Sequence, residues 1–243
     1  FFDYIIADKN LIKKSEEKWF SEKVVYMPKC YQINNPGIVI AKKKFSRKEC
    51  GLPEKGMVIA SFTQVYKLES ELFDIWCRIL SAVEGSVLWL WKQDGEAETN
   101  LGREAEKRGI DPKRIIWAER LPKAEHLARM SLADLALDTK VYGGHTTTTD
   151  SLIAGVPVIT RYGTHFASRV SASILKTVDL SELVVDNLEK YEKLAISLAS
   201  DPAKLKKLKA KITRKRLEKD LINPAKFVRY LDGEYEKLYN DYI

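Results

Sequence analysis

The chain has 243 residues, of which 45% are hydrophobic, and its 41 Lys and Arg against 34 Asp and Glu give a net charge of +7. This length and composition suffice for one large globular domain or two small ones, and they exclude a low-complexity or disordered protein. No apolar run approaches the roughly 20 residues that cross a bilayer, and the start, Phe1-Phe2-Asp3-Tyr4, has neither an initiating Met nor a signal pattern, so we expect a cytoplasmic protein without a membrane span, cut from a longer chain.

Residues 1–37 are predicted to be the end of a separate domain. Tyr4–Asp8 and 24–27 are short apolar runs with a polar, helical segment between them, and they predict two strands whose partners lie upstream. The loop signal Asn34-Asn35-Pro36-Gly37 places a domain boundary nearby. Residues 38–56 are then predicted to be a linker.

From Met57 onward, short apolar runs alternate with segments of helical spacing, such as the one that contains Leu72, Ile75, Trp76 and Ile79. Strands that are apolar throughout and alternate with helices indicate a parallel sheet covered on both faces. We therefore predict an α/β fold with a doubly wound parallel sheet. The predicted strands are 57–62, 86–91, 114–117, 133–138 and 157–160, and the predicted helices between them are 69–83, 96–108, 123–130 and 147–154.

Four trailing helices are predicted at 165–175, 187–199, 202–219 and 224–242. The third carries much of the excess positive charge. Its Leu205, Leu208 and Ile212 are spaced as a buried stripe, so we interpret the surrounding lysines and arginines as a solvated face. A surface for acidic lipid or nucleic acid is the alternative. Because no motif of a nucleic-acid module accompanies the charges, we expect no nucleic-acid partner.

The stretch from Gly143 to Asp150 joins a predicted strand to a predicted helix through a glycine turn. Glycines let a backbone approach a ligand, and the amides that begin a helix, at the positive end of its dipole, favour a phosphate. Thr and Asp are also ordinary capping residues, so a helix cap without a ligand is the alternative. Asp150 likewise has two interpretations, as an acceptor for ribose hydroxyls or as a charge that complements the dipole.

Two neighbouring loops at the same edge of the predicted sheet carry further polar side chains. Lys67 offers a mobile charge for phosphate oxygens, and Gln64 offers a donor and an acceptor. Lys123, His126 and Arg129 are spaced i, i+3 and share one helix edge, where an imidazole can stack on a flat base. Each side chain alone is also typical of an ordinary surface. Together, without a Walker loop or a dinucleotide fingerprint, they favour a nucleotide-sugar site.

We expect neither a metal nor another cofactor. The three histidines lie on separate predicted elements, without carboxylates at ligand spacing. The three cysteines are scattered and odd in number, so we interpret them as reduced and structural. These residues are His126, His145 and His165, and Cys30, Cys50 and Cys77.

Four motifs in order resemble the catalytic region of O-GlcNAc transferases, glycosyltransferase family 41. The motifs are Ser61-Phe62-Thr63-Gln64-Val65-Tyr66-Lys67, Ser86-Val87-Leu88-Trp89-Leu90, Pro122-Lys123-Ala124-Glu125-His126 and the stretch from Gly144 to Pro157. The resemblance runs along nearly the whole chain. The chain has no long insertion between Pro36 and Gly51, and in this it resembles the compact, bacterial-style members of the family.

The resemblance implies part of a two-lobed GT-B enzyme that is inverting and metal-free. In this interpretation residues 1–37 end the N-terminal catalytic lobe and 38–56 are the linker. Residues 57–223 are the Rossmann-like lobe that binds the UDP sugar, and 224–243 form a helix that packs back towards the N-terminal lobe. The donor is UDP-N-acetylglucosamine, and the acceptors are Ser and Thr hydroxyls of a protein or peptide. Most of the N-terminal lobe and the upstream helical repeats lie outside these residues, so the chain is expected to bind UDP and transfer little sugar.

Roles for individual residues are also implied by the resemblance. Lys67 neutralises the departing UDP, and Gln64 lies near the diphosphate and sugar. Uracil stacks on His126 and meets the backbone of Leu121, while Lys123 and Arg129 contact the nucleoside. The diphosphate is held by His145, Thr146 and Thr147, and the ribose by Asp150.

Three positions depart from the family pattern: Thr63 stands where Asn is expected, Thr148 where Gly is frequent and Ile153 where Trp is common. The acceptor-side histidine of the family is missing, so no general base is predicted. Two alternatives stay open. One is a protein N-glucosyltransferase of the same family that uses UDP-glucose, and the other is a non-catalytic module that binds nucleotide sugars or scaffolds an assembly.

Overall fold

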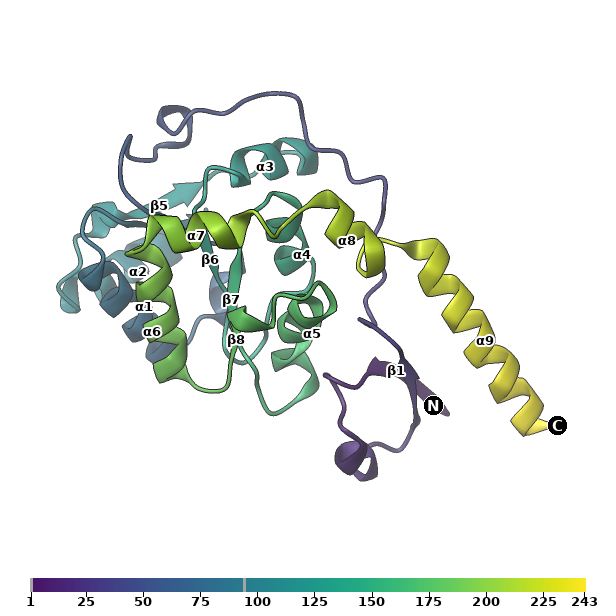
Figure 1. The fold of residues 1–243 in the computed structure, drawn as a ribbon. Coiled ribbons are helices and arrows are strands. Elements are labelled where there is room, and N and C mark those ends of the chain that lie inside the picture. Colours follow the sequence, from purple (N-terminus) through teal and green to yellow (C-terminus); the bar gives the residue numbers. More distant parts are fainter. Residues whose placement is uncertain (1, 94) are drawn as a thin grey trace.

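The computed structural model describes residues 2–93 and 95–243. A small two-stranded sheet lies beside a larger six-stranded sheet (Figure 1). In the small sheet, β1 (Tyr4–Asp8) pairs in parallel with β2 (Lys23–Met27). The segment between them is the 3-10 helix η1 (Lys14–Trp19). Both predicted strands are therefore confirmed, and each is the other's partner.

The doubly wound parallel sheet is also confirmed. Its strand order is β5-β4-β3-β6-β7-β8, with every neighbouring pair parallel. Strands β4 and β5 follow β3 towards one edge of the sheet, and β7 and β8 follow β6 towards the other edge. In such sheets the ligand crevice lies beyond the carboxyl ends of the strands where the order reverses, which is here between β3 and β6. The strands are β3 (Val58–Ser61), β4 (Val87–Trp91), β5 (Ile115–Ala118), β6 (Leu135–Leu137), β7 (Val158–Arg161) and β8 (Val184–Val185).

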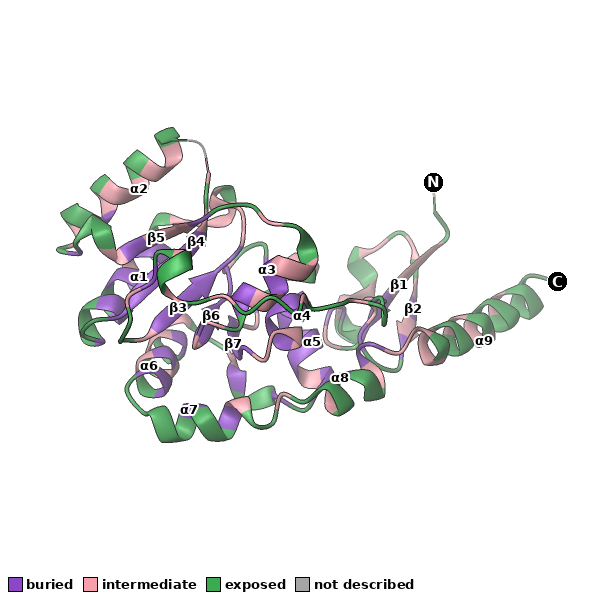
Figure 2. Cartoon of the chain, turned by 90° about the horizontal axis from the view of Figure 1, so that it is seen from above, coloured by how far each residue is buried: buried purple, intermediate pink, exposed green. Residues whose placement is uncertain are grey.

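Helices cover both faces of this sheet, and buried residues fill the space between the layers (Figure 2). Successive strand side chains point to opposite faces. Ile59 and Leu88 join a core cluster with residues of α1, α5 and α6, whereas Ala60 and Trp89 join a second cluster with Met130 of α3. The helices are α1 (Ser70–Ala82), α2 (Gly95–Lys107), α3 (Lys123–Met130), α4 (Thr146–Ile153), α5 (Val170–Thr177), α6 (Leu188–Ala199), α7 (Pro202–Lys209), α8 (Arg214–Asp220) and α9 (Pro224–Tyr242), with short 3-10 helices η2 (Lys48–Cys50), η3 (Val65–Lys67), η4 (Pro112–Arg114), η5 (Phe166–Ser168) and η6 (Ser181–Leu183).

Two sequence predictions in the last third of the chain need correction, and one strand was missed. The predicted helix 202–219 is two helices, because Thr213 begins α8 by accepting a hydrogen bond from the Arg216 amide at 3.2 Å. The predicted helix 165–175 begins as η5, and α5 starts only at Val170. Strand β8 was not predicted, because two residues are too few for a periodic pattern.

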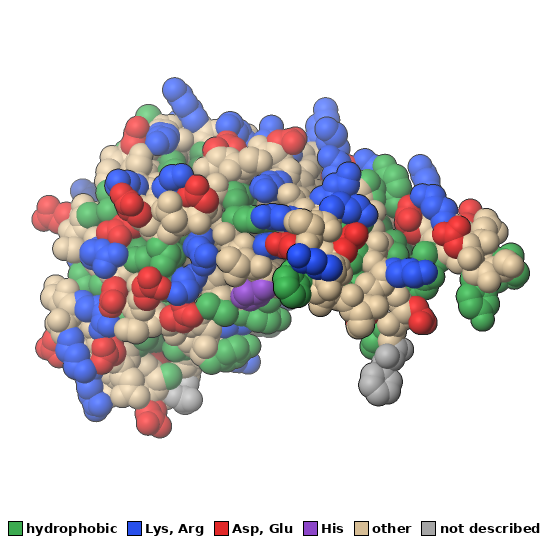
Figure 3. Space-filling view, turned by 90° about the horizontal axis from the view of Figure 1, so that it is seen from below, with side chains coloured by type: hydrophobic (Ala, Val, Ile, Leu, Met, Phe, Trp, Pro, Cys, Tyr) green, Lys and Arg blue, Asp and Glu red, His purple; other side chains and the backbone are tan. Residues whose placement is uncertain are grey.

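The basic segment is largely solvated, as interpreted. Leu205 and Leu208 are buried, whereas Lys204, Lys206 and Lys207 are exposed. On the face drawn in Figure 3, cations and carboxylates are interspersed. Within the described residues, no helix combines the length and hydropathy of a membrane span.

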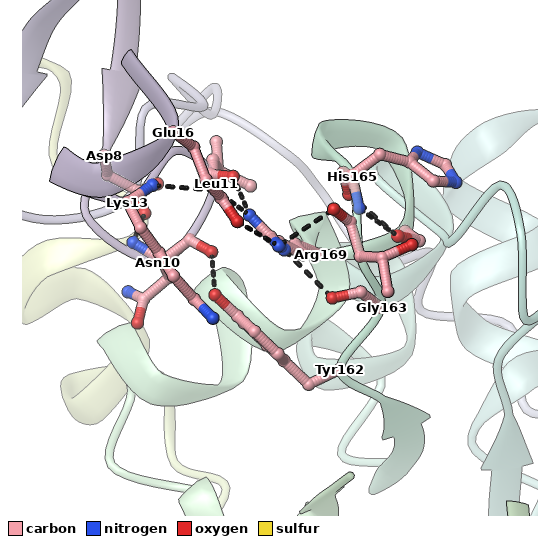
Figure 4. A network of polar contacts seen from close by, with 11 residues as sticks. Asp8, Asn10, Leu11, Lys13, Glu16, Tyr162, Gly163, His165 and Arg169 are labelled. Atoms are coloured by element: carbon pink, nitrogen blue, oxygen red, sulfur yellow. Dashed lines mark hydrogen bonds and ion pairs between the residues drawn. The ribbon is translucent and has the colours of Figure 1, made fainter. Parts of the chain in front are cut away.

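Arg169 ties the small sheet to the large one (Figure 4). This residue is only 3% exposed, and its guanidinium donates to both carboxylate oxygens of Glu16, at 2.5 and 2.8 Å. It also donates to the carbonyl of Leu11 at 2.9 Å, and the nearby hydroxyl of Tyr162 donates to the carbonyl of Asn10 at 2.6 Å. These hydrogen bonds from Arg169 lower the pKa of Glu16 to about 2.

A second contact between the two sheets is the buried carboxylate of Asp8 at the end of β1. It accepts from the Ser173 hydroxyl of α5 at 2.6 Å and from the Tyr31 amide at 3.1 Å. Helix α9 contacts β2 through its first turns, and none of its residues is buried. The small sheet therefore packs firmly on the large one, while the domain limits at residues 37, 56 and 223 stay predictions.

We predict that Glu16→Gln lowers the free energy of unfolding near pH 7 by roughly 2–3 kcal/mol, somewhat less than for a fully buried pair, because Gln keeps an acceptor. A carboxylate whose pKa is lowered on folding contributes its full stability above its ordinary value of 4.5, and that contribution fades as the pH falls towards 2. The difference between wild type and variant should therefore be constant above about pH 5 and shrink below it. Urea denaturation between pH 7 and pH 3 measures the loss of unfolding free energy and its dependence on pH.

Glu17→Gln is the matched control, because the ion pair between Glu17 and Lys14 is exposed to solvent. It should change the unfolding free energy little at any pH. Equal effects of the two substitutions would contradict a specific role for the Glu16–Arg169 pair.

Candidate functional site

Three loops meet where the strand order reverses, and two side-chain contacts connect them. Lys123, at the start of α3, forms an ion pair with Asp150 of α4. The ammonium of Lys67, at the end of η3, lies 3.9 Å from the ring centroid of Tyr142, in the loop before α4. The candidate side chains of the three loops therefore share one edge of the sheet, as the sequence predicted.

The start of α4 is an uncapped helix terminus. Its N-cap is His145, whose side chain makes no capping hydrogen bond. The amides of Thr146 and Thr147, in the first turn, have no acceptor within the helix, and they lie at the positive end of its dipole. Thr146 is exposed and Thr147 is half-buried. This geometry suits an anion and argues against the interpretation of the stretch as a simple helix cap.

Gly144 is required by packing within the protein. A Cβ atom there would come within 2.5 Å of the hydroxyl oxygens of both Thr147 and Thr148. The Thr148 hydroxyl lies 2.7 Å from that of Ser171, which in turn donates to the Gly144 carbonyl at 2.7 Å. The departure from the family at position 148 therefore points inward and braces the turn.

Asp138, which follows β6, holds the other side of this turn. Its fully buried carboxylate accepts from the Gly144 amide at 2.7 Å and from the Thr160 hydroxyl at 2.6 Å. Burial raises its pKa, and these hydrogen bonds oppose that rise. No role was predicted for Asp138, although a carboxylate directly after an apolar strand was the available signal.

His145 is held by two aromatic side chains. Its Nδ1 lies 3.2 Å from the Tyr31 hydroxyl, and its ring stacks on Tyr142 with centroids 5.7 Å apart and planes at 8°. Burial and then the charge of Lys67 lower its pKa, so the imidazole is neutral near pH 7. Its Nε2 is buried and has no partner within the described residues. Tyr31 was missed because 114 residues separate it from His145.

Only one of the two carboxylate oxygens of Asp150 has a partner among the described residues. Oδ2 is paired with Lys123, whereas Oδ1 is buried and has no partner in the described part of the chain. Burial raises the pKa of Asp150, and Lys123 opposes the rise. A buried acceptor without a donor is costly, so this oxygen marks a place where a hydroxyl-bearing ligand would fit.

His126 is buried, not half-exposed as on an ordinary surface helix. Its ring stacks on Trp91 with centroids 4.4 Å apart and planes at 25°, and Phe62 meets it edge-on at 4.9 Å. Arg129 donates from Nε to His126 Nδ1 at 3.4 Å. Burial, with the charges of Arg129 and Lys123, lowers the pKa of His126 to about 3. Trp91 therefore already occupies one face of the imidazole, and stacking of a base on this ring stays a prediction.

A cavity of about 370 Å³ lies beside the residues predicted to meet the base. Half-buried Leu121 and buried Arg129 line it, together with Trp89 and with Phe45 of the predicted linker. The indole nitrogen of Trp89 is buried without a hydrogen-bond partner among the described residues. The lining also includes the charged residues Lys43, Glu49 and Glu119, so the cavity combines aromatic and charged side chains, as many ligand sites do.

The remaining predictions concern Gln64, a metal and the cysteines. Gln64 precedes η3 and is half-buried, and its carbonyl accepts from the Lys67 amide at 3.0 Å. In the described ranges, no group of three or more His, Cys, Asp or Glu is placed to hold a metal. The three cysteines carry free thiols. The prediction that neither a metal nor a cofactor is used stays a prediction.

Comparison with known proteins gives consistent matches. The model of the family described as Glycosyl transferase family 41 matches residues 35–231. The probable UDP-N-acetylglucosamine–peptide N-acetylglucosaminyltransferase SEC of Arabidopsis thaliana is 35% identical over 246 aligned residues, covering 99% of this chain and 25% of that protein. The chain therefore spans about a quarter of the length of this relative.

Two solved structures match in fold. An O-GlcNAc transferase mutant from Thermobaculum terrenum superposes with a TM-score of 0.84 at 28% identity, covering 98% of this chain and 45% of that one. HepE from Anabaena, solved with UDP and glucose, gives a TM-score of 0.62 at 11% identity, covering 98% of this chain and 63% of that one. The second likeness concerns the fold alone.

We predict that His126 stays neutral between pH 8 and pH 5, because its pKa is lowered to about 3. Its ring-proton NMR shifts should not titrate over this range. Trp91→Ala removes the stacked ring and admits water, so it should raise the pKa towards the ordinary value of 6.5. A wild-type midpoint near 6.5 would show that His126 is solvated, contrary to the structure.

Proposed function

The chain belongs to glycosyl transferase family 41, and on that premise we propose that it is the UDP-sugar-binding lobe of an inverting enzyme that transfers N-acetylglucosamine to Ser and Thr hydroxyls of proteins. Its fold is that of the Rossmann-like lobe of GT-B glycosyltransferases. The observation that carries the proposal is the uncapped start of α4, flanked by Lys67 and by the half-satisfied carboxylate of Asp150.

The diphosphate subsite is proposed at the start of α4. The amides of Thr146 and Thr147 have no acceptor within the helix and favour an anion at this place. His145 Nε2 also lacks a partner among the described residues. The half-buried ammonium of Lys67 is close enough to lower the pKa of His145. As the sugar leaves, negative charge grows on the diphosphate, and fixed amides with a nearby ammonium stabilise it without reorganisation.

The nucleoside subsite is proposed along α3. The base enters the space beside Leu121 and Arg129, next to the helix that carries His126. The ribose lies over Asp150, where a hydroxyl donates to the unpaired Oδ1. Lys123 keeps the other oxygen of Asp150 occupied and so fixes the carboxylate for this contact.

We propose that neither a metal nor a cofactor takes part. Lys67 and the helix terminus supply positive charge where a metal would otherwise be needed, and no cluster of metal-binding side chains lies among the described residues. The structure identifies no general base in the described residues, and the chain spans a quarter of its plant relative. The acceptor, a protein or peptide, therefore reacts only when the other catalytic lobe is present.

We predict that this chain alone binds UDP and transfers almost no sugar. Calorimetry should show binding, and Asp150→Asn should weaken it about tenfold, because a charged acceptor for the ribose is lost. Uridine monophosphate should bind more weakly, since one phosphate is missing. Absence of any heat or thermal shift with millimolar UDP would exclude a nucleotide site. Robust sugar transfer by the chain alone would contradict the prediction that it holds only part of the active site.

We predict that Lys67→Ala, in a protein that carries both catalytic lobes, lowers the turnover number by about 100-fold or more and weakens UDP binding by less than about tenfold. The reason is that the ammonium matters most when charge develops on the leaving group. Kinetics with a peptide acceptor and calorimetry with UDP measure the two effects.

Lys140→Ala is the matched control, because Lys140 lies in the loop before α4 but is ion-paired with Glu69 and Glu71. It should leave both quantities nearly unchanged. Equal losses of turnover and UDP affinity in Lys67→Ala would contradict the leaving-group role.

A further inference from the structure

The Lys67 ammonium rests on an aromatic ring instead of a carboxylate. Its nitrogen lies 3.9 Å from the centroid of Tyr142, and none of the ion pairs in the described part of the chain includes it. Burial lowers its pKa, and the more distant charge of Asp138 opposes that change. A half-buried cation of this kind is held by the negative face of the ring.

The position of the Tyr142 ring is fixed by the loop that carries it. The Tyr142 carbonyl accepts from the Thr139 hydroxyl at 2.7 Å, and the amide of the next residue, Gly143, donates to the Ala167 carbonyl at 3.0 Å. The ring itself stacks on His145, the N-cap of α4. Tyr142 is 47% exposed, so part of its side chain stays open to solvent.

This arrangement places a cation near the positive end of a helix dipole. The Tyr142 ring that contacts the Lys67 ammonium also stacks on His145, the N-cap of α4, so the ammonium lies close to the start of this helix. Without an anion this position is electrostatically unfavourable, and a lysine side chain with free rotamers would move away into water. The Tyr142 ring is the side chain that contacts it there.

We propose that Tyr142 is a positioning residue that holds the Lys67 ammonium beside the diphosphate subsite before the donor binds. The inference rests on the proposed function and extends it, because it assigns a role to a residue that does not itself bind phosphate. Holding the lysine in advance reduces the ordering cost of binding a diphosphate. The aromatic ring is the essential part, and the hydroxyl is dispensable.

A first experiment needs no nucleotide. Reductive methylation of the chain, followed by mass spectrometry of its peptides, gives the rate at which Lys67 reacts. Tyr142→Phe keeps the ring and should leave this rate unchanged, whereas Tyr142→Leu should raise it about three- to tenfold. Lys209, which bonds to the Ala133 carbonyl at 3.0 Å far from the site, is the internal reference and should react equally in all variants. An unchanged Lys67 rate in Tyr142→Leu would overturn the proposal.

A second experiment is a double-mutant cycle with UDP. By calorimetry, Tyr142→Leu should weaken UDP binding about three- to tenfold and leave UMP binding unchanged, while Tyr142→Phe should behave as wild type. In a Lys67→Ala background, Tyr142→Leu should have no further effect. A loss of the same size in that background would mean that Tyr142 acts on the ligand directly and would overturn the positioning role.

The two experiments separate the inference from its premise. If the wild-type chain binds no UDP, the proposed function fails, and the methylation rates still decide whether Tyr142 holds Lys67. If UDP binds but the two variants of Tyr142 behave alike, the proposed function stands and the positioning role fails.

Discussion

The buried carboxylate of Asp138 fixes the turn on which the proposed site depends. It lies at the end of β6, at the point where strand order reverses, and it accepts the Gly144 amide and the Thr160 hydroxyl. The backbone of the same residue is anchored in the core, because its carbonyl accepts from Tyr191 of α6 at 2.8 Å. A buried carboxylate is tolerated only when such donors surround it, so the turn before α4 has little freedom. The first-turn amides of α4 are therefore held in place before any ligand arrives.

The charges around this turn divide into two kinds. The two histidines of the site, His126 and His145, are kept neutral because burial and neighbouring cations lower their pKa values. The basic side chains of the site are those of Lys67, Lys123 and Arg129. Neutral rings suit stacking and hydrogen bonding, and fixed cations suit phosphate. Neutral rings beside cationic side chains suit a leaving group that is stabilised by electrostatics.

Much of the fold could be predicted from sequence, because its signals are local. Apolar runs such as Val58–Ser61 and the helical spacing in α1 predict a parallel sheet. The parallel sheet in turn predicts the edge at which the loops meet. The break at Thr213 was missed because a buried stripe at Leu205 and Leu208 continues smoothly towards Ile212 in sequence. Contacts between distant residues were also out of reach. The partner of His145 is Tyr31, and the partner of Arg169 is Glu16, and no local pattern connects either pair.

The most direct test of the central claim is an NMR titration of the ¹⁵N-labelled chain with UDP. If the start of α4 holds the diphosphate, the largest amide shift changes should fall on Gly144, Thr146 and Thr147, with smaller ones at Lys67 and Leu121. Saturating changes confined to other surfaces, such as the lysine-rich face of α7, with the α4 turn unaffected, would contradict the account.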